Sequence, residues 1–225
     1  MFDRIAHRYD LLNRMLSMRQ DVAWRNRLAR CLNDTPGQRV LDLATGTGDV
    51  LLTLCRRNSN VSSGVGVDMS GRMLGYGHEK AAAAGLGSRL RFVRGDATRI
   101  PVPEGFFDAV TISFGIRNVI DVPTALREMR RVLKPGGRVL ILEFSLPGNP
   151  LFRSLYLWYF RKVLPRIGGV ISGDHHAYRY LNQTVETFPY GDAFCQLMED
   201  AGFRDLKAIP LTFGIATIYQ GDKQA

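Results

Sequence analysis

Two polar side chains that could take part in chemistry, Arg117 and Asn118, stand side by side in the stretch SFGIRNVID, directly after an apolar run that predicts a buried strand. A simple connector needs neither of them. Both can donate hydrogen bonds to an oxygen that gains negative charge, but a guanidinium is a poor general base because it stays protonated at any ordinary pH. The alternative is that Arg117 pairs with Asp121 and Asn118 caps the next helix.

A second group of candidate residues follows the predicted strand VLDLA, where Gly46 and Gly48 lie in a tight turn and a helix opens at Asp49. Glycines let a backbone approach a ligand closely, and a helix N-terminus offers unpaired N–H groups. Leu51 and Leu52 occupy the region where a dinucleotide fingerprint has its third glycine, which serves the pyrophosphate. The turn therefore favours a ligand other than a dinucleotide.

Two acids end the next two predicted strands. Asp68 ends the second strand, where a carboxylate can accept hydrogen bonds from both hydroxyls of a ribose. Asp96, followed by Ala97, ends the third strand, beside the place where an adenine would lie. Together with the glycine turn, these acids predict a nucleoside site without a diphosphate. The alternative is that each Asp only ends its strand and caps a helix, as Asp often does.

The elements that must position these residues alternate from Arg39 onward. Apolar runs predict strands at RVLDLA (39–44), GVGVD (64–68), LRFVRGD (90–96), FDAVTISF (107–114) and RVLILEF (138–144). Amphipathic runs predict helices at VLLTLCRR (50–57), MLGYGHEKAAAAG (73–85) and from the N-cap Asp121, with Pro123 in the first turn, to the stop at KPGG. Apolar strands separated by helices predict an open α/β sandwich, with a parallel sheet covered on both faces.

The tail of the chain follows a different pattern. After a helix that carries Phe194 and closes at Gly202 come two strand-like runs, FRDLKAI and FGIATIYQ, with only PLT between them. A linker that short demands an antiparallel hairpin at the edge of the sheet. Residues 1–34, predicted as two helices, and the insertion at about 149–188 lie outside the alternation, and we expect a single domain over residues 1–225.

Composition narrows the setting. The net charge of +9 is compatible with nucleic acid or an anionic membrane surface. The cysteines, Cys31, Cys55 and Cys195, are odd in number and form no CxxC pair, which argues against disulfides and a structural zinc site and favours a reducing cytoplasm. The N-terminus resembles no secretion or transit signal, and no apolar run approaches the length of a membrane span.

The cofactor signature resembles that of class I S-adenosylmethionine-dependent methyltransferases. Asp42, the glycine turn, Asp68, Asp96 and the later LKPGG carry this resemblance. It implies a Rossmann-like sheet of seven strands, mostly parallel, whose last two strands form an antiparallel edge hairpin. The hairpin expected from the tail agrees with it.

A narrower resemblance covers nearly the whole chain. The segments FDRIAHRYDLLNRMLS, SFGIRNV, RVLKPGG, LEFS, YRYL and LTFGIATIYQG are similar to those of the ubiquinone/menaquinone biosynthesis C-methyltransferases. This resemblance implies S-adenosyl-L-methionine-dependent methylation of a ring carbon of a polyprenylated quinol. We expect demethylmenaquinol as the substrate, with a 2-methoxy-6-polyprenyl-benzoquinol of ubiquinone biosynthesis as the alternative.

The resemblance also implies the site residues. The cofactor contacts that it places on this chain are Gly46, Thr47, Gly48, Asp68, Met69, Asp96, Ala97 and Ser113. For catalysis it implies Arg117 and Asn118, which would hold the developing phenolate and a ring oxygen, together with Tyr9. Tyr9, His175, His176 or a water could accept the proton, and the sequence does not rank them.

The insertion suggests where the enzyme works. The stretch NPLFRSLYLWYFRKVLPRIGGV has four basic residues and no acid among its apolar and aromatic side chains, a composition that suits the surface of an anionic bilayer. We therefore expect a cytoplasmic enzyme peripherally associated with the inner face of the cell membrane. The alternative is a helix packed on the sheet or on a second subunit, as in a homodimer. The adjacent His175 and His176 do not predict a metal site.

Three other functions are less consistent with the sequence. A nucleic-acid methyltransferase is favoured by the net charge, but the fourth strand ends in SFGIRN rather than an Asn-Pro-Pro-Tyr type motif, and no Pro-Cys nucleophile is present. A nicotinamide oxidoreductase would need the third glycine of the dinucleotide fingerprint, which this sequence lacks. A non-catalytic binding module would leave SFGIRN without a role.

Overall fold

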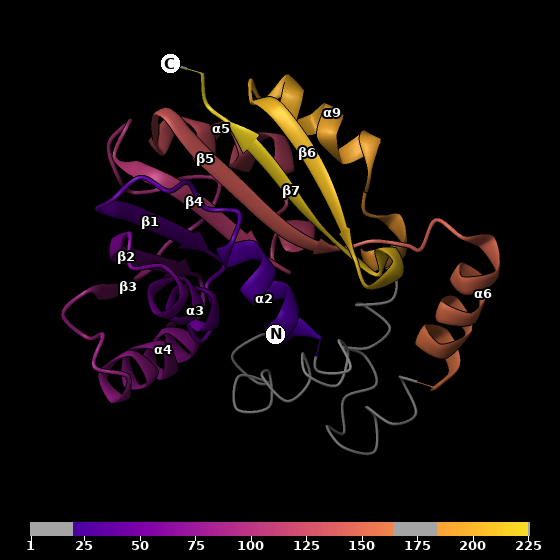
Figure 1. Ribbon diagram of the computed structural model, residues 1–225, viewed down its shortest axis with the longest axis horizontal. Coiled ribbons are helices and arrows are strands. Elements are labelled where there is room, and N and C mark those ends of the chain that lie inside the picture. Colours follow the sequence, from indigo (N-terminus) through magenta and orange to yellow (C-terminus); the bar gives the residue numbers. More distant parts are fainter. Residues whose placement is uncertain (1–19, 164–183, 225) are drawn as a thin grey trace.

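A single mixed sheet of seven strands, in the order β3-β2-β1-β4-β5-β7-β6, forms the body of the molecule (Figure 1). The computed structural model describes residues 20–163 and 184–224. The strands are β1 (Gln38–Leu43), β2 (Val61–Asp68), β3 (Leu90–Arg94), β4 (Phe107–Ser113), β5 (Leu133–Phe144), β6 (Arg204–Leu211) and β7 (Ala216–Asp222). Each of the five strands expected between residues 39 and 144 is present.

The strand directions confirm the predicted topology. β1 pairs in parallel with β2 and β4, β2 with β3, and β4 with β5. β7 runs antiparallel to both β5 and β6, which makes the C-terminal edge the expected hairpin. The carboxyl ends of the five parallel strands therefore lie along one edge of the sheet, where open α/β sheets bind ligands.

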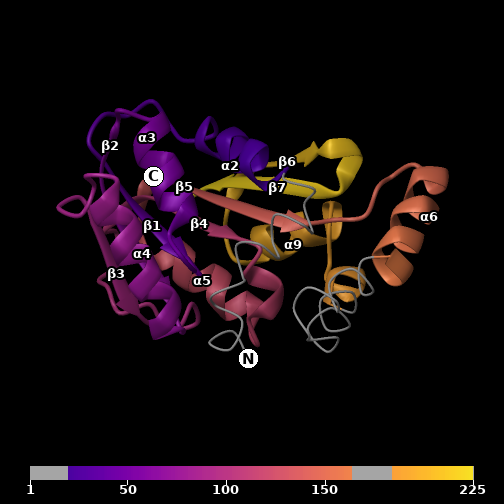
Figure 2. The same ribbon diagram turned by 90° about the horizontal axis from the view of Figure 1, so that it is seen from below.

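Helices cover both faces of the sheet (Figure 2). One face packs against α2 (Asp21–Ala29), α3 (Asp49–Arg57) and α4 (Gly71–Ala83), and the other packs against α5 (Val122–Val132) and α9 (Asp192–Asp200). The strands have side chains buried on both faces, so they read in the sequence as almost continuous apolar runs.

The start of α5 is as predicted and its end lies within one residue of the predicted stop, but β5 begins earlier than expected. The Asp121 carboxylate accepts a hydrogen bond from the Thr124 N–H at 2.9 Å, and Pro123 lies in the first turn. The helix ends at Val132 and β5 begins at once, so KPGG lies inside the strand rather than before it. The register shifts there, and Gly136, with φ 75°, makes the bend possible without strain from a side chain.

The two segments expected outside the alternation are described in part. The second of the two N-terminal helices is α2; the first lies outside the described residues. The insertion begins with α6 (Pro150–Trp158), followed by a π-helical turn, η2 (Tyr159–Val163). Figures 1 and 2 both show α6 beside the carboxyl edge of the sheet rather than on either face. The division of residues 1–225 into one domain with two added segments stays a prediction.

Candidate active site

A cavity of about 620 Å³ opens at the carboxyl ends of β1, β2 and β4, beside the loop that follows β3. This volume is in the range of sites for small molecules and cofactors. The sequence-predicted residues that line it are Gly46, Asp68, Met69, Asp96, Ala97 and Asn118. Residues that lie up to 72 positions apart in the chain thus meet in one place, because the parallel strands end at the same edge.

Asp68 joins the glycine turn to the second strand. Its Oδ2 accepts a hydrogen bond from the Gly46 N–H at 2.9 Å, and its Oδ1 accepts one from the Ser70 N–H at 2.8 Å. A carboxylate can accept about four hydrogen bonds, so both oxygens keep the capacity to accept ribose hydroxyls. The turn itself is tight: Gly48 has φ 78°, and a Cβ there would lie 2.7 Å from the ring of Phe92.

Three of the expected cofactor contacts, Thr47, Gly48 and Ser113, do not line the cavity. The Thr47 hydroxyl accepts a hydrogen bond from Lys80 Nζ at 2.7 Å, toward α4. Ser113 lies at the end of β4, and its buried Oγ has no hydrogen-bond partner within residues 20–163 and 184–224. Their roles in cofactor binding stay predictions, as do those of the lining residues.

A buried carboxylate, that of Asp42, stabilises the loop that carries the glycine turn. Asp42 accepts hydrogen bonds from the hydroxyls of Thr45 and Thr111, each at 2.6 Å. Because the group is fully buried, desolvation raises its pKa to about 7, against the effect of the two hydroxyls. Thr45 belongs to the loop that carries Gly46, so Asp42 fixes the position of that loop relative to β4.

Arg117 and Asn118 point to different places. Both belong to η1 (Ile116–Asn118), a 3-10 turn in which successive side chains are about a third of a turn apart. Asn118 lines the cavity, whereas Arg117 does not: its Nη1 donates to Glu143 Oε1 at 2.5 Å and to the Phe114 carbonyl at 2.8 Å. The two side chains were expected to face the ligand together, but only Asn118 lines this cavity. The catalytic roles of both residues stay predictions.

The alternative, in which Arg117 pairs with Asp121 and Asn118 caps the next helix, is wrong. Arg117 pairs with Glu143 rather than with Asp121, and Asp121, not Asn118, caps α5. Tyr9, His175 and His176, the groups considered as proton acceptors, lie outside the described residues.

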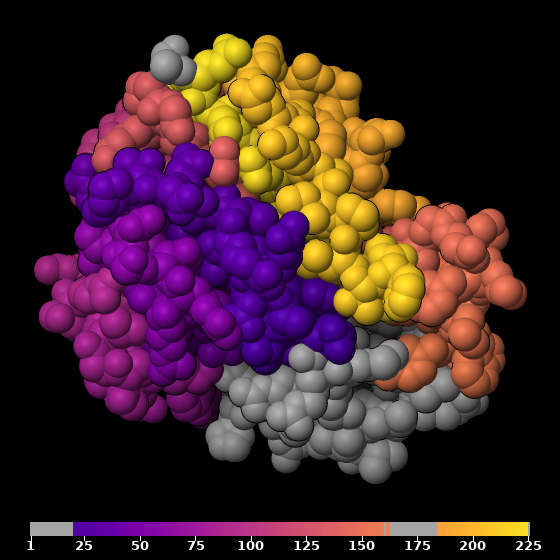
Figure 3. Space-filling view, in the orientation of Figure 1, coloured from indigo at the N-terminus to yellow at the C-terminus, as the bar shows by residue number. Residues whose placement is uncertain are grey.

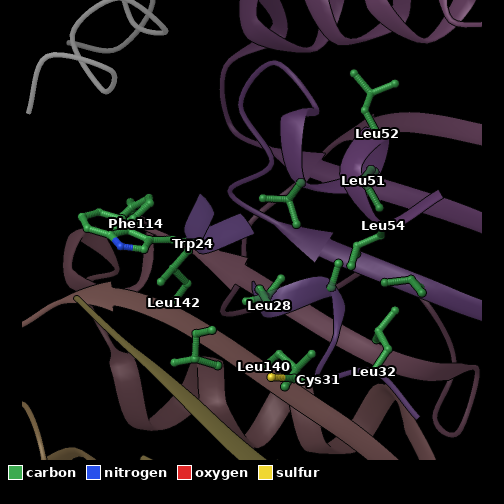
Figure 4. Close-up of a cluster of buried hydrophobic side chains, with 14 of the residues drawn as sticks. Trp24, Leu28, Cys31, Leu32, Leu51, Leu52, Leu54, Phe114, Leu140 and Leu142 are labelled. Atoms are coloured by element: carbon green, nitrogen blue, oxygen red, sulfur yellow. The ribbon is translucent and has the colours of Figure 1, made fainter. Parts of the chain in front are cut away.

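Phe114 is the wall between the cavity and an aromatic cluster. Its ring centroid lies 4.6 Å from that of Phe144 and 6.0 Å from that of Trp24, which Figure 4 shows against it at one end of the core. Phe114 has φ 55°, a left-handed conformation that is unusual for an aromatic residue and is found more often at functional sites. Tyr156 of α6 is buried beside this cluster, and burial raises the pKa of its phenol, partly offset by the charge of Arg117.

Glu143, Phe114 and Trp24 are candidate site residues that the sequence analysis did not single out. The signal for Glu143 is present in the strand RVLILEF, where it is the one acid in an otherwise apolar run predicted to be buried. A buried acid is costly unless it is paired, so such a position predicts a partner. Trp24 and Phe114 have no comparable signal, because aromatic residues are common in cores.

The fold and the cavity define a class I S-adenosyl-L-methionine-dependent methyltransferase. The strand order, the glycine turn and a carboxylate with free acceptor capacity fit this cofactor, and the cavity has room for it. The family model described as the ubiE/COQ5 methyltransferase family matches residues 1–223. The chain belongs to this family.

Curated relatives match over almost the whole chain. It is 48% identical to the Geobacter sulfurreducens "Ubiquinone/menaquinone biosynthesis C-methyltransferase UbiE", over 99% of this chain and 87% of that protein. It is 48% identical to the Thermus thermophilus "Demethylmenaquinone methyltransferase", over 99% of this chain and 100% of that protein. It is 47% identical to the Deinococcus radiodurans protein of the same name, over 100% of this chain and 91% of that protein.

Solved structures agree on the fold. A SAM-dependent methyltransferase from Aquifex aeolicus has a TM-score of 0.62 at 18% identity, over 88% of this chain and 89% of that chain. A protein from Methanococcus maripaludis, also described as S-adenosyl-L-methionine-dependent, has a TM-score of 0.70 at 19% identity. The match covers 99% of this chain and 94% of that chain. At such identities the likeness shows the fold alone, and it is the expected one.

Proposed function

We propose that this methyltransferase transfers a methyl group to a ring carbon of a polyprenylated quinol, converting demethylmenaquinol to menaquinol. The observation that carries the proposal is the 48% identity to a "Demethylmenaquinone methyltransferase" over the full length of that relative. The relatives named for both ubiquinone and menaquinone biosynthesis make the benzoquinol the alternative substrate.

The chemistry of the reaction requires the reduced ring. The bound cofactor supplies an electrophilic methyl carbon on a sulfonium. A quinol ring carbon becomes nucleophilic when the neighbouring hydroxyl loses its proton; it then forms the new C–C bond as the C–S bond breaks, and the ring proton leaves. What the protein must do is to align the reactants and exclude water. Asn118 in the cavity and the apolar wall at Phe114 suit these two tasks.

The experiment is a methyl-transfer assay with labelled cofactor and each of the two quinols, kept reduced. Transfer to demethylmenaquinol at least tenfold faster than to the benzoquinol supports the proposal, and the reverse ratio supports the alternative. The oxidised quinones are the matched control and should accept no methyl group. Absence of transfer to both quinols would contradict the proposed function.

We further propose that α6 holds the enzyme on the cytoplasmic face of the cell membrane. Leu151, Leu155 and Trp158 recur at helical spacing on one side of α6 and are 82%, 60% and 58% exposed. Phe213, 81% exposed, adds to this apolar surface, since its ring contacts that of Phe152 on α6. Figure 3 shows α6, in orange, at the margin of the molecule, where it is accessible.

The charge of residues 150–163 and the solubility of the proposed substrate also favour a location at the membrane surface. Residues 150–163 include three basic side chains and no acid, which suits anionic lipid, and a polyprenylated quinol resides in the bilayer. Within the described ranges, no helix is long and apolar enough to cross a membrane. The described cysteines are free, in keeping with a reducing compartment.

Vesicle flotation tests this contact. Leu155→Ser with Trp158→Ser should reduce flotation with anionic vesicles at least fivefold, whereas Val93→Ser, which changes an exposed apolar side chain elsewhere on the sheet, should not. If flotation is unchanged but sedimentation shows that the double variant dissociates a dimer, α6 is a contact between two copies instead.

A further inference from the structure

Arg117 has a buried hydrogen-bond donor that its neighbours do not use. Its side chain is 8% exposed, and Nη1 donates to both Glu143 and the Phe114 carbonyl. Nε is buried and has no acceptor among the residues that the structure describes. Leaving such a donor unsatisfied is costly, so an unused one beside the cavity points to an acceptor supplied by a ligand.

Glu143 fixes the orientation of this donor. The carboxylate is 1% exposed at the end of β5, and its Oε1 accepts hydrogen bonds from Arg117 Nη1 at 2.5 Å and from the Phe144 N–H at 2.8 Å. Its Oε2 lies 3.5 Å from the backbone N of Arg117. One carboxylate on a rigid strand therefore contacts both the side chain and the backbone of Arg117.

The surroundings suit an aromatic ring that carries an oxygen. Arg117 Cζ lies 5.4 Å from the ring centroid of Phe144, and Phe144 and Phe114 pack against each other beside Trp24. Phe114 is also part of the wall of the cofactor cavity. The donor therefore belongs to an apolar region next to the place where the methyl group is delivered.

Resting on the proposed function, we propose that Glu143 is a positioning residue for the quinol. It holds the guanidinium so that Nε donates to a ring oxygen, and its negative charge balances the positive charge of Arg117 before that oxygen ionises. Glu143 acts through Arg117 and takes no proton from the substrate. The charge balance has a consequence: with Glu143 neutral, the unbalanced guanidinium would favour the phenolate and the ring would ionise at lower pH.

Glu143→Gln is the direct test, because glutamine keeps an oxygen that can accept from Nη1 and from the Phe144 N–H but removes the charge. We expect affinity for S-adenosyl-L-methionine within twofold of wild type, kcat for the quinol reduced at least tenfold, and the acid limb of the kcat profile shifted to lower pH. Glu128→Gln is the matched control, since Glu128 also forms an ion pair with an arginine, Arg131, but belongs to α5, on the opposite face of the sheet from Phe114 and Phe144. A Glu143→Gln enzyme with wild-type kcat, KM and pH profile would overturn the proposal.

A binding measurement separates this proposal from the proposed function. In a Trp158→Phe background, Trp24 is the fluorophore that remains, and its quenching reports the binding of 2-methyl-1,4-naphthohydroquinone. Glu143→Gln should weaken this binding at least fivefold relative to Glu128→Gln even if wild type methylates neither quinol, in which case only the proposed function fails. Equal binding by the two variants would count against the positioning role.

Discussion

The backbone N–H of Gly46 donates a hydrogen bond to the carboxylate of Asp68 at 2.9 Å, across the ends of two neighbouring parallel strands. The acid expected to accept the ribose hydroxyls thus also closes the glycine turn. We therefore expect cofactor affinity and the shape of the turn to depend on the same side chain.

Asp68→Ala should therefore reduce affinity for S-adenosyl-L-methionine at least tenfold, since it removes the acceptors for the ribose and loosens the turn. Titration calorimetry measures the effect. Asp108→Asn is a suitable control because Asp108 also accepts a backbone N–H, that of Arg39, but at the other end of the sheet. Equal affinity of the Asp68 variant and wild type would contradict the assignment.

Arg117→Ala should lose turnover and also destabilise the protein by about 3–5 kcal/mol, because it leaves the buried carboxylate of Glu143 without its partner. The double variant Arg117→Met with Glu143→Gln has no buried charge at this place and should recover most of the free energy of unfolding but none of the turnover. Urea unfolding and methyl-transfer assays on wild type, the single variant and the double variant separate the effect on stability from the effect on turnover. Recovered turnover in the double variant would show that Arg117 serves stability alone.

Asp42 should make the free energy of unfolding depend on pH. Burial raises its pKa from 3.8 to about 7, so the folded protein keeps a proton that the unfolded chain loses. The resulting stabilisation is fully present below about pH 4 and is lost as the pH rises to about 7, by at most about 4 kcal/mol. Asp42→Asn should flatten this part of the curve, measured by urea unfolding at several pH values. Parallel curves for both proteins would refute the expectation.

Gly48→Ala should destabilise the protein by more than about 1 kcal/mol and weaken cofactor binding. The residue has φ 78°, and the new methyl group would lie 2.7 Å from the ring of Phe92. Gly75→Ala is the matched control: Gly75 lies in α4, a Cβ there has no atom within 4 Å, and the change should be neutral or stabilising. Thermal unfolding with and without cofactor distinguishes the two variants.

Most of the fold could be predicted from local patterns. Strands buried on both faces read as apolar runs, Asp121 and Pro123 indicate where α5 begins, and a three-residue linker leaves only an antiparallel connection for the last two strands. The start of β5 was misplaced because KPGG is typical of a turn between elements. In the structure it is accommodated as an irregular beginning of β5, paired with β4 and β7 beyond the bend.

Local patterns also predicted part of the site. Gly46, Asp68 and Asp96 follow strand ends, and the carboxyl ends of parallel strands converge, so their meeting in one cavity follows from the topology. The pairing of Arg117 with Glu143 connects residues 26 positions apart and depends on the direction in which a 3-10 turn points each side chain. No local pattern contains that information.

Periodicity and motifs of a few neighbouring residues were enough to predict the class of sheet, the order of its elements, the family and the residues at the strand ends. Two features could be seen only in the folded chain: Asn118 lines the cavity while Arg117 pairs with Glu143, and Phe114 lies between the cavity and the aromatic cluster. Burial and ion pairing depend on which side chains meet in space, and packing brings together residues that are far apart in the chain.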